Sequence, residues 1–126
     1  MTADEEKKTI LVIEDDLDVL SIIIKHLKLE GFEVIIATDG MEGLKKLETG
    51  HYDLVITDIV MPNMTGDKLA EKIIDIRSDI PVILCTGYSE KITRKDASEM
   101  GIQSFLMKPL VMRDLANTVR QALSAN

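Results

Sequence analysis

Charged side chains capable of chemistry come directly after short apolar segments at four positions of this chain: Glu14, Asp15, Asp58 and Lys108. The apolar segments are too rich in Ile, Val and Leu to be half-solvated, which favours buried strands covered on both faces. In open parallel α/β sheets, functional residues gather beyond the carboxyl ends of the strands. We therefore expect these four groups to converge on one rim of a sheet.

Three carboxylates at one rim would repel one another, by roughly 4 kcal/mol for a close pair at an effective dielectric of about 20. A hard divalent cation relieves this repulsion, and Mg²⁺ held by carboxylates, waters and a phosphate fits such oxygen ligands. Lys108 supplies a second positive charge, and Thr86 ends another apolar segment with a hydroxyl. This set suits phosphoryl transfer, in which a carboxylate oxygen attacks in line while cations neutralise the phosphoryl oxygens.

Each acid taken alone also has a structural explanation. Asp16 is a good N-cap and carboxylates favour a first helical turn, so Glu14 and Asp15 fit a solvated helix start. Asp58 fits the start of a turn at residues 61–63. The expected convergence of all three acids is what favours a site.

Strand-like and helical segments alternate along the chain. The strand candidates are residues 9–14, 33–37, 52–57, 81–85 and 103–107. Helical spacing of apolar residues covers 17–27, 41–47, 69–74 and 112–123, and more weakly 89–100. This alternation predicts an α/β fold, a doubly wound parallel sheet with helices on both faces, in three layers.

Composition bounds the class of protein. The 126 residues fit one domain, and residues 1–8 are charged with little to bury, which indicates a flexible leader or linker. A net charge of −7 with no Trp argues against a nucleic-acid surface. No apolar run approaches the roughly 18 residues that span a bilayer. A cytoplasmic protein without membrane insertion is expected.

Three residues with reactive side chains are interpreted as structural. Cys85 lies in an apolar segment, where a small buried thiol is expected, and no disulfide can form within the chain. His26 and His51 lie away from the predicted rim, so we expect surface or hydrogen-bonded histidines.

The order of these landmarks resembles the receiver domain of two-component response regulators. The acidic pair comes first, then Asp58 in Asp-Ile-Val-Met-Pro-Asn-Met-Thr-Gly, then Thr86 and finally Lys108-Pro109. The resemblance runs from Thr9 to the C-terminus and implies a receiver domain over residues 9–126. The fold that it implies is the flavodoxin-like five-stranded sheet of order 2-1-3-4-5.

The resemblance assigns a role to each rim residue. Asp58 is the phospho-acceptor, Asp15 the direct Mg²⁺ ligand and Glu14 the holder of a metal-bound water. The backbone carbonyl of Val60 also faces the metal. Glu14 replaces the commoner Asp of the family, and its longer side chain can still reach a water.

Three further residues are implied to carry the signal. Lys108 pairs with the phosphoryl oxygens, Thr86 moves to hydrogen-bond them, and Phe105 turns inward, without the hydroxyl of the Tyr that is frequent there. The resemblance predicts a changed surface around helix 4, strand 5 and helix 5, near Ile92, Phe105 and Met112. It implies a regulatory switch that catalyses its own phosphorylation and dephosphorylation, rather than an enzyme.

The implied partners are a sensor histidine kinase, or its phosphohistidine domain, and a downstream protein. A phosphorylation-dependent dimer stays open. The segment from Cys85 to Leu115 is similar to receivers fused to the C-terminus of sensor histidine kinases, which favours that arrangement over a free-standing receiver.

Two alternatives use related folds. A haloacid-dehalogenase-like phosphohydrolase also uses Asp, Mg²⁺, Thr and Lys, but it needs a second Asp where this chain has Val60. A flavodoxin-like cofactor binder needs a phosphate loop after the first strand, where residues 14–16 are acidic and would repel the phosphate.

Overall fold

The computed structural model describes residues 7–58, 66–77, 79–86, 102, 104–107 and 109–124, with only the backbone of residues 66, 67 and 86. Within these residues the strands are β1 (Thr9–Ile13), β2 (Glu33–Ala37), β3 (Leu54–Asp58), β4 (Val82–Thr86) and β5 (Ser104–Met107). The helices are α1 (Leu17–Leu29), α2 (Gly40–Thr49), α3 (Gly66–Ile76) and α5 (Met112–Ser124). The helix predicted over residues 89–100 lies outside the described residues.

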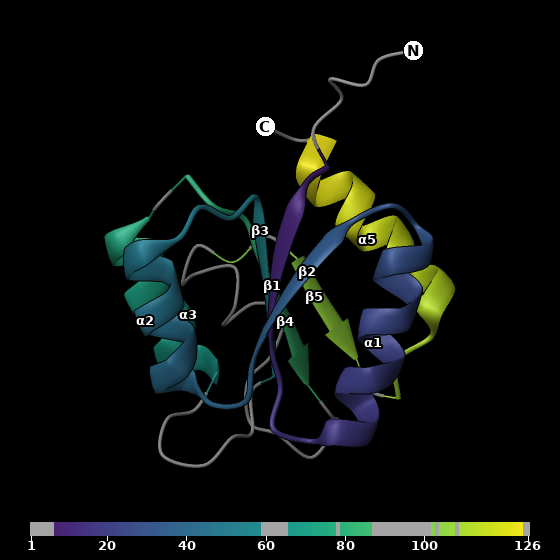
Figure 1. Cartoon of the computed structure of the whole chain (residues 1–126), viewed down its shortest axis with the longest axis horizontal. Coiled ribbons are helices and arrows are strands. Elements are labelled where there is room, and N and C mark those ends of the chain that lie inside the picture. The colour runs from purple at the N-terminus through teal and green to yellow at the C-terminus, as the bar shows by residue number, and fades with distance from the viewer. Residues whose placement is uncertain are drawn as a thin grey trace.

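The strands form one parallel sheet of order β2-β1-β3-β4-β5 (Figure 1). The predicted fold class and strand order are therefore confirmed. The chain places β1 between β2 and β3, so the carboxyl end of β1 lies beside that of β3. In register, Ile13 is the partner of Thr57, which brings the residues that follow them together.

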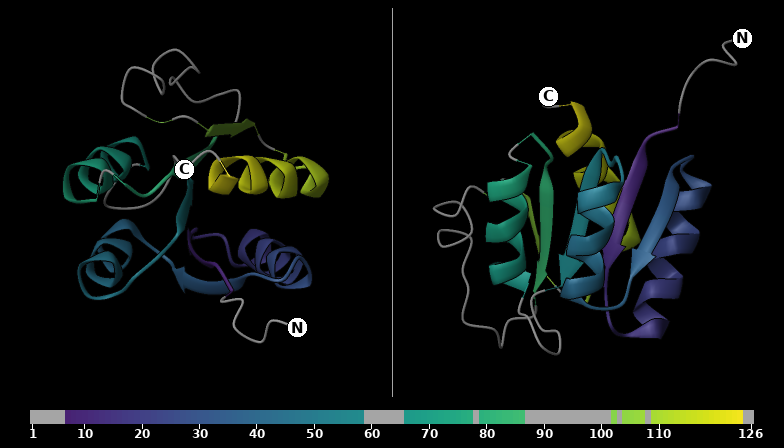
Figure 2. Two further views of the ribbon diagram at one scale, coloured as in Figure 1. Left: turned by 90° about the horizontal axis from the view of Figure 1, so that it is seen from above. Right: turned by 60° about the vertical axis from the view of Figure 1, so that its left-hand side comes forward.

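Helices cover both faces of the sheet in three layers, with α2 and α3 on one face and α1 and α5 on the other (Figure 2). Alternation along β1 divides its side chains between the two faces. Leu11 and Ile13 pack toward α2 and α3, whereas Ile10 and Val12 pack toward α1 and α5. All four are fully buried, which explains why the strand is a continuous apolar run.

The predicted strand bounds needed small corrections. Asp58 is the last residue of β3 instead of the first residue beyond it, and β3 begins at Leu54 instead of residue 52. Asp53, the residue before β3, makes two hydrogen bonds to Thr9 of β1. Its N–H donates to the Thr9 carbonyl, and its carboxylate accepts from the Thr9 N–H. The side chain of Tyr52 is buried in the core. These contacts anchor the entry to β3 without making it part of the strand.

None of the helices in the described part of the chain has the length and apolar character that crossing a membrane requires.

Candidate phosphoryl-transfer site

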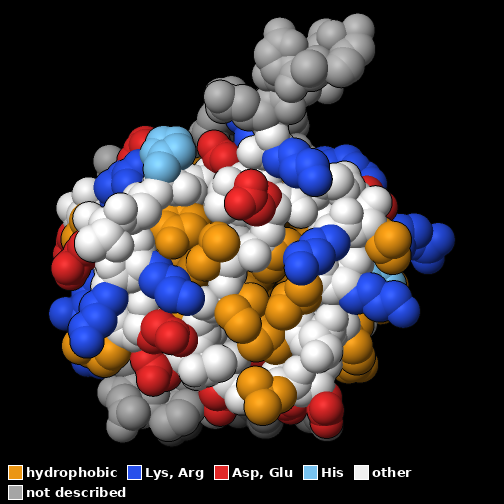
Figure 3. Space-filling view, viewed as in Figure 1, with side chains coloured by type: hydrophobic (Ala, Val, Ile, Leu, Met, Phe, Trp, Pro, Cys, Tyr) orange, Lys and Arg blue, Asp and Glu red, His pale blue; other side chains and the backbone are white. Residues whose placement is uncertain are grey.

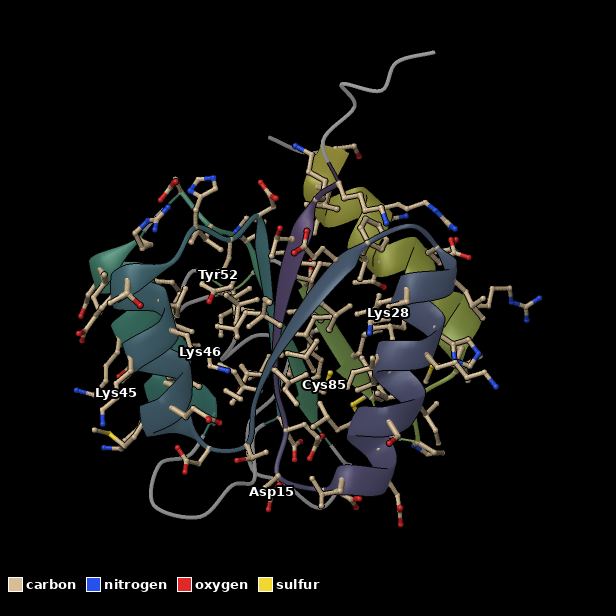
Figure 4. All side chains as sticks on the ribbon, in the orientation of Figure 1. Asp15, Lys28, Lys45, Lys46, Tyr52 and Cys85 are labelled. Carbon is tan, nitrogen blue, oxygen red and sulfur yellow. The ribbon has the colours of Figure 1, made fainter. Side chains whose placement is uncertain are left out.

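Three carboxylates converge where β1 and β3 end. Glu14, Asp15 and Asp58 each offer an oxygen that lies within 4.8 Å of the others. Figure 4 shows Asp15 at this rim, beyond the carboxyl end of β1. The convergence expected from the sequence is confirmed for the three acids.

The three acids differ in their exposure. Glu14 is 2% exposed and Asp58 is 5% exposed, whereas Asp15 is exposed to solvent. Their oxygens lie within 4.8 Å of each other, so if both buried groups are charged their repulsion is roughly 3.5 kcal/mol or more for an effective dielectric of about 20. Buried carboxylates with this spacing provide hard oxygen ligands, so the donor set fits a Mg²⁺ ion.

The turn between β1 and α1 holds this acidic cluster in place. The Glu14 N–H donates to the carbonyl of Ala37 at 3.0 Å, which fixes the end of β1 against the end of β2. The Asp16 N–H donates to Glu14 Oε2 at 3.1 Å. Sequence reasoning missed this second contact of Glu14, although an acid two residues before an N-cap is a signal for it.

Asp16 itself caps helix α1. Its Oδ1 accepts from the N–H groups of Asp18 at 3.0 Å and Val19 at 3.2 Å. The structural explanation considered for the acids is therefore correct for Asp16, and it does not extend to the buried Glu14. Of the three consecutive acids in this turn, Asp16 therefore caps the helix, whereas Glu14 and Asp15 belong to the carboxylate cluster.

Thr57 fixes the end of β3 beside the acceptor candidate. Its side chain is fully buried, and its hydroxyl donates to the carbonyl of Asp58 at 3.2 Å. A polar residue inside an apolar strand was the available signal, and sequence reasoning did not use it. The contact orders the backbone from which the Asp58 carboxylate extends.

The remaining site residues lie partly outside the described part of the chain. Thr86 ends β4, and the register pairs Asp58 with Cys85, so the Thr86 backbone lies one residue beyond the partner of Asp58. The Thr86 side chain, Lys108 and Val60 are not among the described groups. Their roles stay predictions.

Phe105 is in β5 and only 8% exposed, in the same apolar cluster as Leu84 and Ile102. Its ring is thus already buried in this structure, and the predicted movement on activation stays a prediction. Cys85 is a buried free thiol, as expected. His51 is exposed, and the His26 ring contacts the carbonyl of Ile22 at 3.0 Å, which confirms the interpretation of both histidines.

The fold and the rim together define a class: doubly wound α/β proteins with buried carboxylates at the carboxyl end of the sheet. Over residues 10–120 the sequence matches the family described as response regulator receiver domain. The chain belongs to this family. It is a receiver domain, a phosphorylation-dependent switch of two-component signalling, and domains of this family are regulatory.

Individual proteins agree with the family assignment. The chain is 32% identical over 118 residues to the response regulator receiver protein CpdR of Brucella abortus, covering 94% of this chain and 98% of CpdR. It is 34% identical over 116 residues to the sensor protein EvgS of Escherichia coli, covering 92% of this chain and 10% of EvgS. The crystal structure of the response regulator TrrA of Thermotoga maritima, in complex with Mg(2+)-BeF, has a TM-score of 0.83 and 34% identity. It covers 92% of this chain and 99% of that one.

The chain matches very different fractions of the length of its relatives. It spans about half the length of several curated relatives, 48% in one case. What a whole protein containing this domain does is therefore a proposal.

Proposed function

We propose that Asp58 accepts a phosphoryl group from a phosphohistidine of a sensor histidine kinase or its phosphohistidine domain. One observation carries this proposal: Asp58 ends β3 with its carboxylate buried and two other carboxylates within 4.8 Å. A buried acid at the carboxyl end of a parallel strand is placed for chemistry with a ligand that approaches the rim.

The transfer is a substitution at phosphorus. A carboxylate oxygen of Asp58 forms the new oxygen–phosphorus bond while the bond from phosphorus to the imidazole nitrogen breaks. The electron pair of the broken bond returns to the imidazole, which leaves as the neutral ring once it has a proton. The product is an acyl phosphate on Asp58, and its later hydrolysis resets the switch.

Asp15, Asp58 and Glu14 are the side chains proposed to hold Mg²⁺, with Glu14 acting through a water and the Val60 carbonyl as a further ligand. When bound, the ion neutralises charge on the phosphoryl oxygens. Asp15 is exposed to solvent, which supports access to its carboxylate from outside.

The output is proposed to involve Thr86, Lys108 and Phe105. Lys108 pairs with the phosphoryl oxygens, Thr86 hydrogen-bonds them, and the surface near Phe105, Ile92 and Met112 changes. The position of β5 supports this proposal, because the strand carries the buried Phe105 and pairs with β4 up to Thr86. A downstream protein that reads this surface completes the proposal, and a phosphorylation-dependent dimer stays open.

We further propose a cytoplasmic domain, because phosphohistidine donors and a buried free thiol both suit that compartment. Residues 1–8 are proposed as a leader or linker before the receiver domain of residues 9–126. The similarity to EvgS supports a position inside a larger protein, whereas the similarity to CpdR supports a free-standing receiver. The complete open reading frame decides between them.

The acceptor is tested with acetyl phosphate and Mg²⁺, followed by intact-mass measurement. We expect one added phosphate on the parent and none on Asp58→Asn, which lacks the nucleophilic oxygen. Asp16→Asn is the matched control: it lies in the same acidic turn, keeps a capping oxygen and should label like the parent. If Asp58→Asn is labelled as well as the parent, the assignment of Asp58 as phospho-acceptor is wrong.

The switch is tested separately by amide exchange with and without beryllofluoride. The largest change is expected around Ile92, Phe105 and Met112. A change confined to α1 instead contradicts the proposed output surface while leaving the acceptor assignment intact.

A further inference from the structure

The free edge of β2 is the feature on which the inference rests. β2 is the last strand of the sheet on its side, and Figure 1 shows it at the front of the molecule between α1 and α2. An edge strand presents unpaired N–H and C=O groups to which a strand of another chain can add. The question is what keeps this edge from pairing.

The backbone groups that face the free edge belong to alternate residues of β2. The Glu33 N–H donates to Lys8 and the Ala37 carbonyl accepts from Glu14, so residues 33, 35 and 37 face β1. Because direction alternates along a strand, Val34 and Ile36 face away from it. Because β2 pairs only with β1 in the sheet, the N–H and carbonyl of Val34 and the N–H of Ile36 have no strand beside them among the described residues.

The edge is also apolar. Ile36 is 37% exposed, and Val34 and Ile35 are partly exposed beside it. Figure 3 shows apolar side chains along the middle of this face, with lysine or arginine side chains on both sides. An exposed strand edge with apolar side chains is a site at which chains associate.

Helix α2 closes the remaining edge groups. Lys46 Nζ donates to the carbonyl of Ile36. One turn earlier, Glu42 Oε1 accepts from the Thr38 N–H at 2.7 Å, just past the end of β2. Glu42 and Lys46 are four residues apart, so they share one face of α2, and Figure 4 shows Lys46 directed toward β2 while Lys45 points away.

The open groups are self-complementary. If β2 of a second copy lies antiparallel with Val34 opposite Ile36, each residue exchanges two backbone hydrogen bonds with its partner, four in all. This register places Glu33 opposite Ala37, so no like charges meet directly across the edge. Of the groups needed for the four bonds, the Ile36 carbonyl is the one that Lys46 occupies.

We propose that the β2 edge is a latent pairing surface for a second copy of this chain, and that Lys46 keeps it closed by occupying the Ile36 carbonyl. Glu42 limits the surface further by occupying the Thr38 N–H. The arrangement keeps the edge free of a second copy, so that association of two chains is left to other surfaces.

The test compares Lys46→Met with Lys45→Met by light scattering across micromolar to millimolar concentrations. Both variants remove one lysine of α2 and add the same side chain, but only Lys46 contacts the edge. We expect the mass of Lys46→Met to rise with concentration toward twice the monomer mass. The parent and Lys45→Met should not associate through the β2 edge and should keep the monomer mass. Lys46→Arg, which keeps a donor, should behave as the parent, and Lys46→Ala should associate without an added apolar tail.

Amide exchange locates the contact. In the associated variant the Val34 and Ile36 amides should exchange at least tenfold more slowly than in the monomer. A Lys46→Met variant that melts like the parent and stays monomeric overturns the proposal. So does association that leaves the β2 amides unprotected, because another face is then responsible. If deletion of residues 1–6 from Lys46→Met abolishes its association, the proposal is also overturned, because the leader of another chain and not its β2 then binds to the β2 edge.

Discussion

Glu14, Asp15 and Asp16 are consecutive acids with three different environments. Glu14 is buried and accepts from the Asp16 N–H, Asp15 is exposed at the rim, and Asp16 caps α1. Only the first two belong to the carboxylate cluster with Asp58. Mutation of Asp15 and of Asp16 can therefore separate the proposed metal binding from helix capping.

We expect Mg²⁺ to raise the melting temperature of the parent and not that of Asp15→Asn, because the variant lacks a proposed carboxylate ligand. Without Mg²⁺, this variant should melt at or above the parent temperature, since one of three like charges is gone. Asp16→Ala should keep the Mg²⁺ effect and lose about 1 kcal/mol of stability, the usual cost of an N-cap. Thermal melts of both variants with and without Mg²⁺ give the comparison. An unchanged Mg²⁺ effect in Asp15→Asn contradicts its role as a ligand.

The sequence was sufficient to predict that Glu14, Asp15 and Asp58 meet, because each lies at or just beyond the carboxyl end of a strand of a parallel sheet. It did not predict the burial of Glu14 or the bond from Thr57 to the Asp58 carbonyl. Those features depend on distances between side chain and backbone that only the folded turn sets. A strand pattern identifies the rim, whereas the neighbours of each group decide its environment.

At the scale of the elements, helix α2 packs close to the sheet at a glycine. Gly43 is buried, and a Cβ at this position would lie 2.5 Å from Cδ1 of Ile13. Ile13 is the last residue of β1, directly before Glu14. The packing of α2 therefore bears on the strand end that carries the acidic cluster.

We expect Gly43→Ala to destabilise the fold by about 1 kcal/mol, because overpacking costs about 1–3 kcal/mol and the gain in helix propensity offsets up to about 1 kcal/mol. Ile13→Val removes the methyl group with which the new Cβ collides. The two substitutions together should therefore cost less than the sum of the separate costs. Urea unfolding of the parent, both single variants and the double variant measures this coupling. Strict additivity would show that α2 moves away and Ile13 does not limit the approach.

At this scale the apolar runs predicted all the described strands, with bounds that differ by two residues at most. The apolar spacing over residues 17–27 likewise predicted α1, in which Leu20, Ile23 and Leu27 are buried, whereas Leu17 at its start is 66% exposed. The sequence did not predict that Glu42 and Lys46 contact the edge of β2. Periodicity gives the elements, but it does not say which polar side chains of a helix reach the strand beside it.

At the scale of the whole molecule, the acidic cluster and the buried contacts before β3 lie at opposite ends of the sheet. Figure 4 shows Asp15 at the carboxyl end of β1 and Tyr52 toward the other end, where β3 begins. Tyr52 is 7% exposed and packs in the core cluster on the α2 and α3 face. Changes at Tyr52 should therefore alter global stability without altering the acidic rim.

Burial raises the pKa of the Tyr52 hydroxyl above its ordinary value of about 10, because the core disfavours the charged phenolate. The folded state then binds this proton more tightly than the unfolded state does. Its stabilising contribution is complete below about pH 10 and is lost as the pH rises through the pKa of the folded state. We expect the stability of the parent to fall as the pH rises above about 10, and that of Tyr52→Phe, which has no proton to lose there, to fall less. Urea unfolding of both proteins across about pH 8–11 measures the difference, and the titration of lysines cancels because it is common to both. Parallel pH profiles would show that the phenolate is accommodated in the folded state and that burial of Tyr52 does not limit alkaline stability.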